Sequence, residues 1–483
     1  MGALVAAVNK KKHNVVPTVV TMLRELKHRG DYGHGISTPV SATIVPRLEK
    51  FVPLISSDVA LGHNLSYILP RDKPQPVEGN GFTFVFEGRM FPSPNLPNSS
   101  EVKEFRKKLG SNLMSSTSRI LETLGGSYVF AVAQSNKIIV GRDIFGATPL
   151  YYGEDETACA VASERKALWN IGLTEAKPFP PGNLATITEH GFCFHTVKQV
   201  VMPPKKKLDM ETAARALQLL LFESTRKRVS DLETIAVAFS GGVDSSVVAV
   251  LAKKVGLDVK LVSVGLENQH ELKFAENAAK ALGMPLHLHT YTEDELKETL
   301  PKALWLIEEP HPVNACIAVP FFWLAETVSK LGYPVLLAGQ GADELFGGYR
   351  RYLTEYQQSG PESVEQKMFY DIKNAYQANF QRDNQICSYH QVELRLPFID
   401  RDIIEFALRV PLRLKIASVT DELRKRILRH VAYNLEIPDF IADKRKKAVQ
   451  YTTGVTKVLR RLAKDEDLTL RDYVKKTFAK FYP

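Results

Sequence analysis

The sequence predicts an α/β protein in two parts: a β-rich α+β domain over residues 1–200, and a doubly wound parallel-sheet domain with a helical end over residues 201–483. Three observations indicate this organisation. The 483 residues are 44% hydrophobic, so each part can bury a core of its own. Before residue 200, short strand-like runs are separated by Gly and Pro turns. After it, runs of strand length alternate with runs of helical periodicity, which is typical of a parallel sheet.

The first element is an apolar run from Ala3 to Val8, which follows Gly2 and precedes the basic run Lys10 to Lys12. A secretory signal would carry its charges before the apolar run and a small-residue cleavage site after it. The reverse order here favours a buried first strand. Later strands of this part are expected at residues 82–86, 128–133, 138–140, 158–162 and 184–187.

A linker is predicted over residues 200–213, which contain two prolines and a lysine run, and a helix begins near Met210. Strands of the second part are expected at residues 234–240, 259–266, 286–291 and 334–341, with helices between them, including 247–256 and 271–283. From about Tyr349 onward the sequence is predicted to be mostly helical.

Composition excludes several classes of protein. The net charge is +9, but its basic runs are scattered and do not alternate with aromatic residues, so a solvated basic surface is favoured over a nucleic-acid groove. No apolar run approaches the roughly 18 residues of a membrane-spanning helix, so we expect no membrane anchor and a cytoplasmic location. The cysteines form no CxxC pair and are expected to be reduced and mostly buried; they are Cys159, Cys193, Cys316 and Cys387.

The densest chemical signal is FSGGVDSS at residues 239–246, directly after the first strand of the second part. Its glycines allow backbone N–H groups to approach an anion, its serines add hydroxyl donors, and the next helix directs its positive end at the same place. The motif therefore predicts a phosphate site that differs from the Walker pattern GxxxxGK[ST]. Asp244, inside the loop, is a candidate magnesium ligand.

A second Gly-rich turn, AGQGADELFGGY at residues 338–349, follows a later strand and contains Asp343 and Glu344. Because open parallel sheets bind ligands at the carboxyl ends of their strands, Asp343 and Asp244 are expected to converge on one crevice. Two carboxylates there would hold Mg²⁺ against the β and γ phosphates of ATP. The plainer alternative is that the acidic residues only stabilise a helix N-terminus.

These segments resemble a known family over nearly the whole chain. FSGGVDSS is similar to the SGGxDS pyrophosphate loop, or PP-loop, of ATP pyrophosphatases. Together with SVGLENQHELKFA, AGQGADELFGGYRRY and VELRLPFIDRDIIEFALRVP, it resembles the synthetase half of asparagine synthetases. GRDIFGATPLYYG and AVASERKAL resemble their glutaminase half. The resemblance implies an Ntn-hydrolase-like αββα sandwich followed by an ATP pyrophosphatase domain of the adenine nucleotide alpha hydrolase-like type. In the family, ammonia from glutamine attacks an aspartyl adenylate.

The resemblance also implies site residues, cofactors and partners. KRKKAVQYTTG is similar to the family's lysine-bearing loop with one extra residue, so the lysine facing the phosphates is Lys446 or Lys447. ATP and Mg²⁺ are implied, with small-molecule substrates: a carboxylate such as aspartate, and ammonia or another amine. A homodimer is left open. The implied ATP site consists of Ser240, Gly241, Gly242, Asp244, Ser245, Ser246, Val264, Gly339 and Asp343.

The glutaminase half departs from the family pattern. Family members begin Met-Cys-Gly and use the cysteine as nucleophile, whereas this chain begins Met-Gly. The GHRL motif, whose arginine holds the substrate carboxylate, reads GHNL at residues 62–65, and the NGE motif of the oxyanion hole reads EGR at residues 87–89. Since one lost oxyanion donor costs on the order of a hundredfold in rate, we predict an inactive glutaminase. The degenerate positions are Gly2, Asn64, Glu87, Gly88 and Arg89.

The synthetase half departs at its acceptor side. Gln340 replaces a family glutamate that receives a proton from ammonia, and an amide is no base near neutral pH. Cys316 replaces the arginine that binds aspartate, and Val313 and Asn314 replace threonines. The sequence thus predicts an ATP-dependent, AMP-forming ligase that uses ammonia. The alternatives are another carboxylate and amine pair, a non-catalytic nucleotide-binding interaction protein, or, less favoured, a tRNA-modifying pyrophosphatase.

Overall fold

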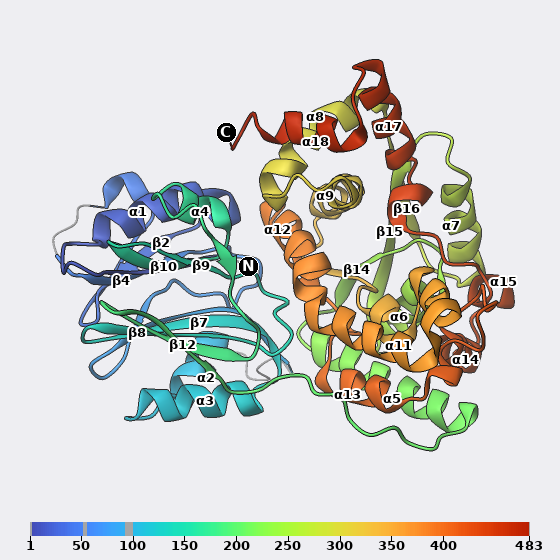
Figure 1. Ribbon diagram of the computed structural model, residues 1–483, viewed down its shortest axis with the longest axis horizontal. Helices are drawn as coiled ribbons and strands as arrows, with labels where there is room; N and C mark the ends of the chain where they lie inside the picture. The colour runs from blue at the N-terminus through green and yellow to red at the C-terminus, as the bar shows by residue number, and fades with distance from the viewer. Residues whose placement is uncertain (1, 52–55, 92–99, 483) are drawn as a thin grey trace. The chain divides into compact units, whose positions relative to one another are not determined.

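The computed structural model describes residues 2–51, 56–91 and 100–482. It divides into two compact units, Met1–Val200 and Val201–Pro483. Figure 1 shows the first unit in blue to green and the second in green to red.

Two antiparallel sheets form the centre of the first unit, and helices cover their outer faces (Figure 1). In the described residues the first sheet has the order β11 (Lys177–Pro178), β9 (Tyr151–Glu154), β10 (Ala158–Ala162), β1 (Ala3–Asn9), β4 (Val59–Asn64), β2 (His34–Ser37) and β3 (Ala42–Val45). The second has the order β13 (Gly191–Thr196), β12 (Asn183–Thr188), β8 (Lys137–Arg142), β7 (Gly126–Gln134), β6 (Thr83–Met90) and β5 (Val77–Glu78).

The helices complete a sandwich of αββα type. α1 (Val16–Glu25) and α4 (Arg165–Trp169) pack on the first sheet, through β1, β4, β9 and β10. α2 (Glu101–Lys108) and α3 (Leu113–Thr123) pack on the second, through β6, β8 and β12. The fold predicted for this part of the chain is therefore confirmed.

Strand β1 explains why the chain begins with a continuous apolar run. It pairs with β4 on one side and with β10 on the other, so it is a central strand. Val5 and Ala7 face the core beneath α1, whereas Leu4, Ala6 and Val8 face the core between the two sheets. Since both faces are buried, no polar residue alternates with the apolar ones.

The second unit is built on a parallel sheet, and the prediction of a doubly wound domain is confirmed. In the described residues its order is β16 (Leu286–Tyr291), β15 (Asp258–Leu266), β14 (Thr234–Ala238), β17 (Val335–Leu337) and β18 (Glu393–Arg395). β15 and β16, which follow β14 in the sequence, lie on one side of it, and β17 and β18 lie on the other side. The strand order therefore reverses next to β14, at the carboxyl ends of β14 and β17, which is where open parallel sheets form a ligand crevice.

Helices cover both faces of this sheet. α6 packs with α5 and α14, while α9 packs with α8, α12 and β15. The helices of the sheet region are α5 (Met210–Val229), α6 (Val243–Lys254), α7 (His270–Ala281), α8 (Glu293–Ile307), α9 (Pro312–Lys330) and α10 (Ala342–Phe346). The later helices are α11 (Arg351–Ala375), α12 (Gln381–Tyr389), α13 (Arg401–Arg409), α14 (Arg426–Asn434), α15 (Asp439–Ala442), α16 (Val449–Thr452), α17 (Val455–Asp465) and α18 (Leu470–Phe478).

Strand β18 lies in the part of the chain that was predicted to be mostly helical. It has three residues, all buried, and two of them are charged. Glu393 and Arg395 neutralise each other at 2.6 Å, and Arg395 also pairs with Asp231 at 2.7 Å. This pairing allows charged residues in a buried strand, and it removes the apolar signal by which such a strand is recognised.

By length and composition alone, helix α9 could cross a membrane, although no segment of this kind was predicted from the sequence. It has 19 residues, with a mean hydropathy of 1.2 over an 18-residue window, of which 67% is buried inside the protein. Its packing against α8, α12 and β15 makes it a core helix of this unit. The prediction for the cysteines is confirmed, because all four are free and Cys193 alone is exposed.

Candidate active site

The first site loop connects β14 to α6. Gly241 has φ of +67°, and Gly242 is the N-cap of α6 without a side-chain cap. Ser240 and Ser245 share a hydrogen bond of 3.3 Å between their hydroxyls. The hydroxyl of Ser246 is buried and has no hydrogen-bond partner among the described residues. Uncapped helix amides beside several hydroxyl groups form an anion site.

The second loop connects β17 to α10 and packs directly on the first. A Cβ atom added at Gly339 would lie 3.1 Å from Cβ of Asp244, so this close approach favours glycine. Gly341 has φ of +92° and is the N-cap of α10, whose first turn contains Asp343. The two loops therefore bring Asp244 and Asp343 to the same crevice, at the point where the strand order reverses.

Two lysines lie between these carboxylates. Lys425 Nζ is 2.5 Å from Asp244 Oδ2 and 2.6 Å from Asp343 Oδ1, and its side chain is 1% exposed. Lys446 Nζ is 2.6 Å from Asp343 Oδ2 and 4.0 Å from Asp244 Oδ2. Burial raises the pKa of Asp343, but the two lysines outweigh it and hold that pKa well below its usual range. Burial alone would lower the pKa of Lys446, but the charges of Asp343 and Asp244 outweigh it, so the pKa is raised above its usual value.

Lys447 lies elsewhere, so the two candidates of the lysine loop are separated by their contacts. Its Nζ pairs with Glu271 Oε1 of α7 at 2.6 Å. Lys444 pairs with the other oxygen of Glu271 at 2.8 Å and donates to the Ser240 carbonyl at 3.3 Å. Lys444 thus ties the lysine loop to the first site loop, and Lys446 lies beside the carboxylates, whereas the exposed Lys447 touches neither.

Lys425 was not among the residues identified from the sequence. It is the N-cap of α14 with φ of +51°, a position where Ser, Thr, Asp or Asn is usual. Three basic residues, Arg424 to Arg426, precede or begin this helix, although the positive end of a helix repels cations. That mismatch is the signal that would have marked Lys425 as a residue with a charged partner.

The carboxylates fit a magnesium ion held jointly with phosphates. Asp244 Oδ1 is buried and makes no hydrogen bond within the described part of the chain. No group of three or more His, Cys, Asp or Glu side chains able to hold a metal occurs in the same residues. Mg²⁺ commonly takes one or two carboxylates and completes its octahedron with waters and substrate phosphates, which matches this donor set.

Val264 lies near the carboxyl end of β15, next to the first site loop. Beyond the last paired residue of β14, the Phe239 N–H donates to the Val262 carbonyl at 2.9 Å, and the Ser263 hydroxyl donates to the Phe239 carbonyl. The loop and the end of β15 are thus held together. Val264, one residue further along β15, lies at the same end of the sheet.

The acceptor side of the crevice contains a network that the sequence did not indicate. Gln340 Nε2 donates to Asp383 Oδ2 of α12 at 3.0 Å. Asp383 Oδ1 accepts from Arg382 Nε at 2.8 Å, and Arg382 Nη1 donates to Asn314 of α9 at 3.3 Å. Burial raises the pKa of the Cys316 thiol, which lies on the same helix as Asn314. The only sequence signal for this network is the run of polar residues from Gln381 to Gln385, all of them buried.

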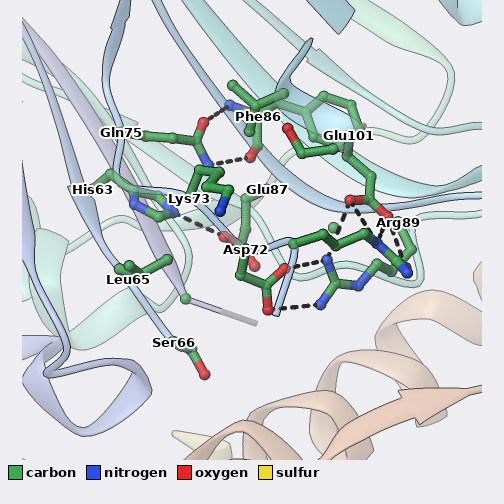
Figure 2. A pocket seen from close by; sticks show the side chains of 15 residues that line it. His63, Leu65, Ser66, Asp72, Lys73, Gln75, Phe86, Glu87, Arg89 and Glu101 are labelled. Atoms are coloured by element: carbon green, nitrogen blue, oxygen red, sulfur yellow. Dashed lines mark hydrogen bonds and ion pairs between the residues drawn. The ribbon is translucent and has the colours of Figure 1, made fainter. Parts of the chain in front are cut away.

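A second candidate site is a small cavity in the first unit, at the degenerate glutaminase positions (Figure 2). Its volume is about 30 Å³, and Glu87, Gly88 and Arg89 of β6 contribute to its walls. His63 Nε2 lies 3.0 Å from Glu87 Oε2, and Arg89 forms an ion pair with Asp72 at 2.5 Å. A space of this size holds about one or two water molecules, far less than a glutamine. Three of the charged pairs among its lining residues are closed on each other: His63 with Glu87, Arg71 with Glu101, and Arg89 with Asp72.

Gly2 lines this cavity, whereas the side chain of Asn64 is turned away from it. A Cβ atom at Gly2 would lie 2.0 Å from the Asn64 carbonyl oxygen, so no larger residue fits there without movement of β4. The Asn64 side chain donates to the Leu23 carbonyl at 2.8 Å and bonds His34 at 2.7 Å. Strand alternation explains its direction, because His63 faces the cavity and its neighbour faces the other side. Asn64 therefore offers no contact for a substrate carboxylate in this cavity.

Comparisons with known proteins give matches to both parts of the chain. The chain matches the asparagine synthase family over residues 216–362 and 353–481, and a glutamine amidotransferase domain family over residues 63–170. Fold and site therefore define a two-domain protein that joins an amidotransferase-type domain to an ATP-dependent synthetase domain. The chain belongs to the asparagine synthetase family of ATP-dependent ligases.

Relatives differ in how much of the chain they share. A putative glutamine-hydrolysing asparagine synthetase of Methanocaldococcus jannaschii is 30% identical over 92% of this chain and 92% of that protein. Asparagine synthetase B of Escherichia coli K12 is 26% identical over 69% of this chain and 62% of that protein. Among solved structures, a PRPP amidotransferase of B. subtilis covers 59% of this chain and 65% of its own, with 16% identity and a TM-score of 0.34.

Proposed function

We propose that the second unit activates a carboxylate, in the first instance aspartate, by adenylation with ATP, and that ammonia or another amine then converts the adenylate into an amide. The carboxylate oxygen attacks the α phosphorus, and the bond to the β phosphate breaks to release pyrophosphate. The amine nitrogen next attacks the acyl carbon, AMP leaves with the bonding electrons, and the nitrogen loses a proton to water. The observation that carries this proposal is the convergence of Asp244, Asp343, Lys425 and Lys446 on one crevice.

The residues of the crevice divide the work by charge. Asp244 and Asp343 would hold Mg²⁺, which neutralises the phosphates and orients them. Lys425 and Lys446 are cations within reach of the same phosphates, and they stabilise the negative charge that develops on the pyrophosphate leaving group. Amides at the start of α6 and the exposed hydroxyl of Ser240 would bind the phosphate oxygens. Each group is fixed before the substrate arrives, which lowers the cost of reorganisation.

We propose further that the first unit does not hydrolyse glutamine. The crowding at Gly2 and the cavity volume of about 30 Å³ support this reading. Amide hydrolysis needs both a nucleophile and a substrate pocket; Gly2 has no side chain at the family's nucleophile position, and the cavity is smaller than a glutamine. Free ammonia is therefore the proposed nitrogen source. A cytoplasmic location and a homodimeric state stay predictions from the sequence.

Pyrophosphate release from ATP tests the proposal. The assay contains Mg²⁺, aspartate and ammonium, and each is omitted in turn, with glutamine replacing ammonium in a parallel series. We expect pyrophosphate and AMP in equal amounts with asparagine from the complete mixture, and no asparagine from glutamine. No carboxylate-dependent pyrophosphate release from any amino acid or dicarboxylate tested would refute the ligase and favour a non-catalytic nucleotide-binding protein.

A different carboxylate is the second candidate. Cys316 is buried at the position implied for the aspartate-binding arginine, and the neighbouring Asn314 bonds Glu309 at 2.9 Å and Arg382 at 3.3 Å. A pocket for the second carboxylate of aspartate would be cationic, whereas these neighbours include the Glu309 carboxylate as well as the Arg382 guanidinium. Exchange of pyrophosphate into ATP, measured over a panel of carboxylates without amine, identifies the substrate directly.

A further inference from the structure

The side chain of Gln340 has a defined orientation because of its partner. Gln340 and Asp383 are 43 residues apart in the sequence, and Gln340 Nε2 lies 3.0 Å from Asp383 Oδ2. An ionised carboxylate only accepts hydrogen bonds, so the amide nitrogen of Gln340 must face it. The amide oxygen Oε1 therefore faces the opposite way.

Asp383 is itself held in place. Its side chain is fully buried, and its second oxygen accepts from Arg382 Nε at 2.8 Å. Arg382 Nη1 donates to the Ala378 carbonyl at 3.0 Å and to Asn314 at 3.3 Å, while its Nη2 donates to Asn379 at 3.4 Å. Ala378 and Asn379 belong to a π-helical segment, Tyr376–Phe380, that leads into α12. With these contacts the carboxylate cannot turn away from Gln340.

Gln340 lies at the crevice, whereas Asp383 lies behind it. Gln340 is three residues before Asp343 on the second site loop and is only partly buried. Because the buried carboxylate takes the amide nitrogen, the exposed side of Gln340 presents its oxygen. The geometry thus supplies a hydrogen-bond acceptor beside the proposed adenylate.

We propose that Asp383 is a positioning residue that fixes Gln340 with Oε1 toward the acyl group, where it accepts a hydrogen bond from an N–H of the attacking amine. The inference rests on the proposed function of the same crevice. The nucleophile it fits is a small neutral amine or ammonia. The nitrogen forms its bond to the acyl carbon, the bond from that carbon to the AMP oxygen breaks, and the displaced proton goes to water.

The pairing also explains why a glutamate at position 340 would not suffice. Gln340→Glu would place two carboxylates about 3 Å apart in a buried site, and one of them would retain a proton. The folded-state pKa of the introduced carboxyl would then rise above its unfolded value. Stability would be full below that unfolded value of about 4.3 and would fall as the pH rises toward neutrality. In the double variant, Asp383→Asn removes this repulsion, because the asparagine amide donates a hydrogen bond to the carboxylate introduced at position 340.

Other charged or titratable groups lie near the Gln340–Asp383 pair. Burial is the first cause that raises the pKa of Asp383, while Arg382 and Gln340 lower it. The groups linked to the pair through charge interactions and hydrogen bonds are Arg382 and Cys387 on α12, Glu344 on α10 through Asn379, and Glu309 just after α8 through Asn314.

The test compares Asp383→Asn, Gln340→Glu and the double variant. Ammonium-dependent amide formation is measured across pH together with carboxylate-dependent exchange of pyrophosphate into ATP, which needs no amine. We expect Asp383→Asn to raise KM for ammonium about tenfold and to leave the exchange unchanged. Gln340→Glu should fail to raise the rate, whereas the double variant should raise it about tenfold or more and flatten its increase with pH.

Gln385→Glu is the matched control. Gln385 lies on α12, the helix that also contains Asp383. Its buried amide donates to the buried carboxylate of Glu308 at 3.1 Å. The Gln385→Glu variant should become less stable as the pH rises, and its KM for ammonium should be unchanged. An unchanged KM in Asp383→Asn, or equal rates and pH profiles for Gln340→Glu and the double variant, would overturn the inference.

The two levels of the proposal fail in different ways. If the wild type shows no carboxylate-dependent exchange, the proposed function is wrong. The pairing is then still decided by urea unfolding across pH, where Gln340→Glu should lose stability between about pH 4 and 7 and the double variant should not. Parallel stability curves for these two variants would show that Asp383 does not face position 340.

Discussion

Lys425→Met is the most informative single change, because it removes a buried charge and conserves side-chain length. The lysine is 1% exposed and lies 2.5 Å and 2.6 Å from two carboxylates, so its loss leaves those carboxylates facing each other. Breaking a buried ion pair costs about 3–5 kcal/mol. The lower end, about 3 kcal/mol, applies here because Lys446 remains 2.6 Å from Asp343.

Two measurements follow from this estimate. Urea unfolding of Lys425→Met should show the loss of about 3 kcal/mol, and Mg²⁺ should restore more stability to this variant than to the wild type, because the ion replaces the missing cation. Carboxylate-dependent exchange of pyrophosphate into ATP should fall about 100-fold or more at saturating Mg²⁺, as expected for one lost charge on the transferring phosphates.

Lys447→Met is the control for this experiment. Its side chain is 61% exposed and pairs with Glu271 outside the crevice, and surface pairs contribute about 0–1 kcal/mol. It should leave stability and exchange nearly unchanged. Wild-type exchange and wild-type stability in Lys425→Met would refute the reasoning, since a buried cation between two carboxylates cannot be silent if the geometry is right.

Asp244→Asn and Asp343→Asn should each reduce exchange about 100-fold at saturating ATP, with far-UV circular dichroism unchanged; exchange at the wild-type rate in either variant would contradict the site. Gly2→Cys should give no ammonia release from glutamine and should lower the thermal midpoint, because its Cβ would meet the Asn64 carbonyl oxygen at 2.0 Å. Asp343 has a depressed pKa in the folded protein, so its stabilisation is present above its unfolded pKa of about 3.9 and is lost as the pH falls. Acid unfolding of Asp343→Asn should therefore be less steep than that of the wild type, and parallel acid curves would count against the pairing with the two lysines.

The two site loops were predictable because their signals are local. Gly, Ser and Asp at fixed offsets after an apolar strand report backbone shape and charge within a few residues, and the strand order then joins the two loops at one edge. The local signals at Lys425 and Asp383, a basic residue at a helix start and a run of polar residues, do not identify a partner, since the partners lie 82 or more and 43 residues away. Only the folded chain brings these segments together.

Other features depend on register and on distant partners, which a motif does not carry. The GHNL motif places Asn64 in a strand but does not say which face it occupies, and a displacement of one residue along a strand exchanges its two faces. β18 was missed because its buried charges are paired with each other, so its sequence looks like that of an exposed segment. In both cases the physics was ordinary, but the information lay in neighbours that are distant in sequence.

The double burial of β1 has an evolutionary consequence. Residues Leu4, Val5 and Val8 are each nearly inaccessible to solvent, and burying side chains of this kind contributes about 1.5–3 kcal/mol apiece. Loss of a side chain at position 2 can abolish chemistry without touching either core, whereas deletion of the strand would remove the centre of both. Selection can therefore relax on the nucleophile while it continues to act on the residues that follow. A domain of this design can keep its fold when a reaction is lost, because catalysis and folding depend on different atoms of the same strand.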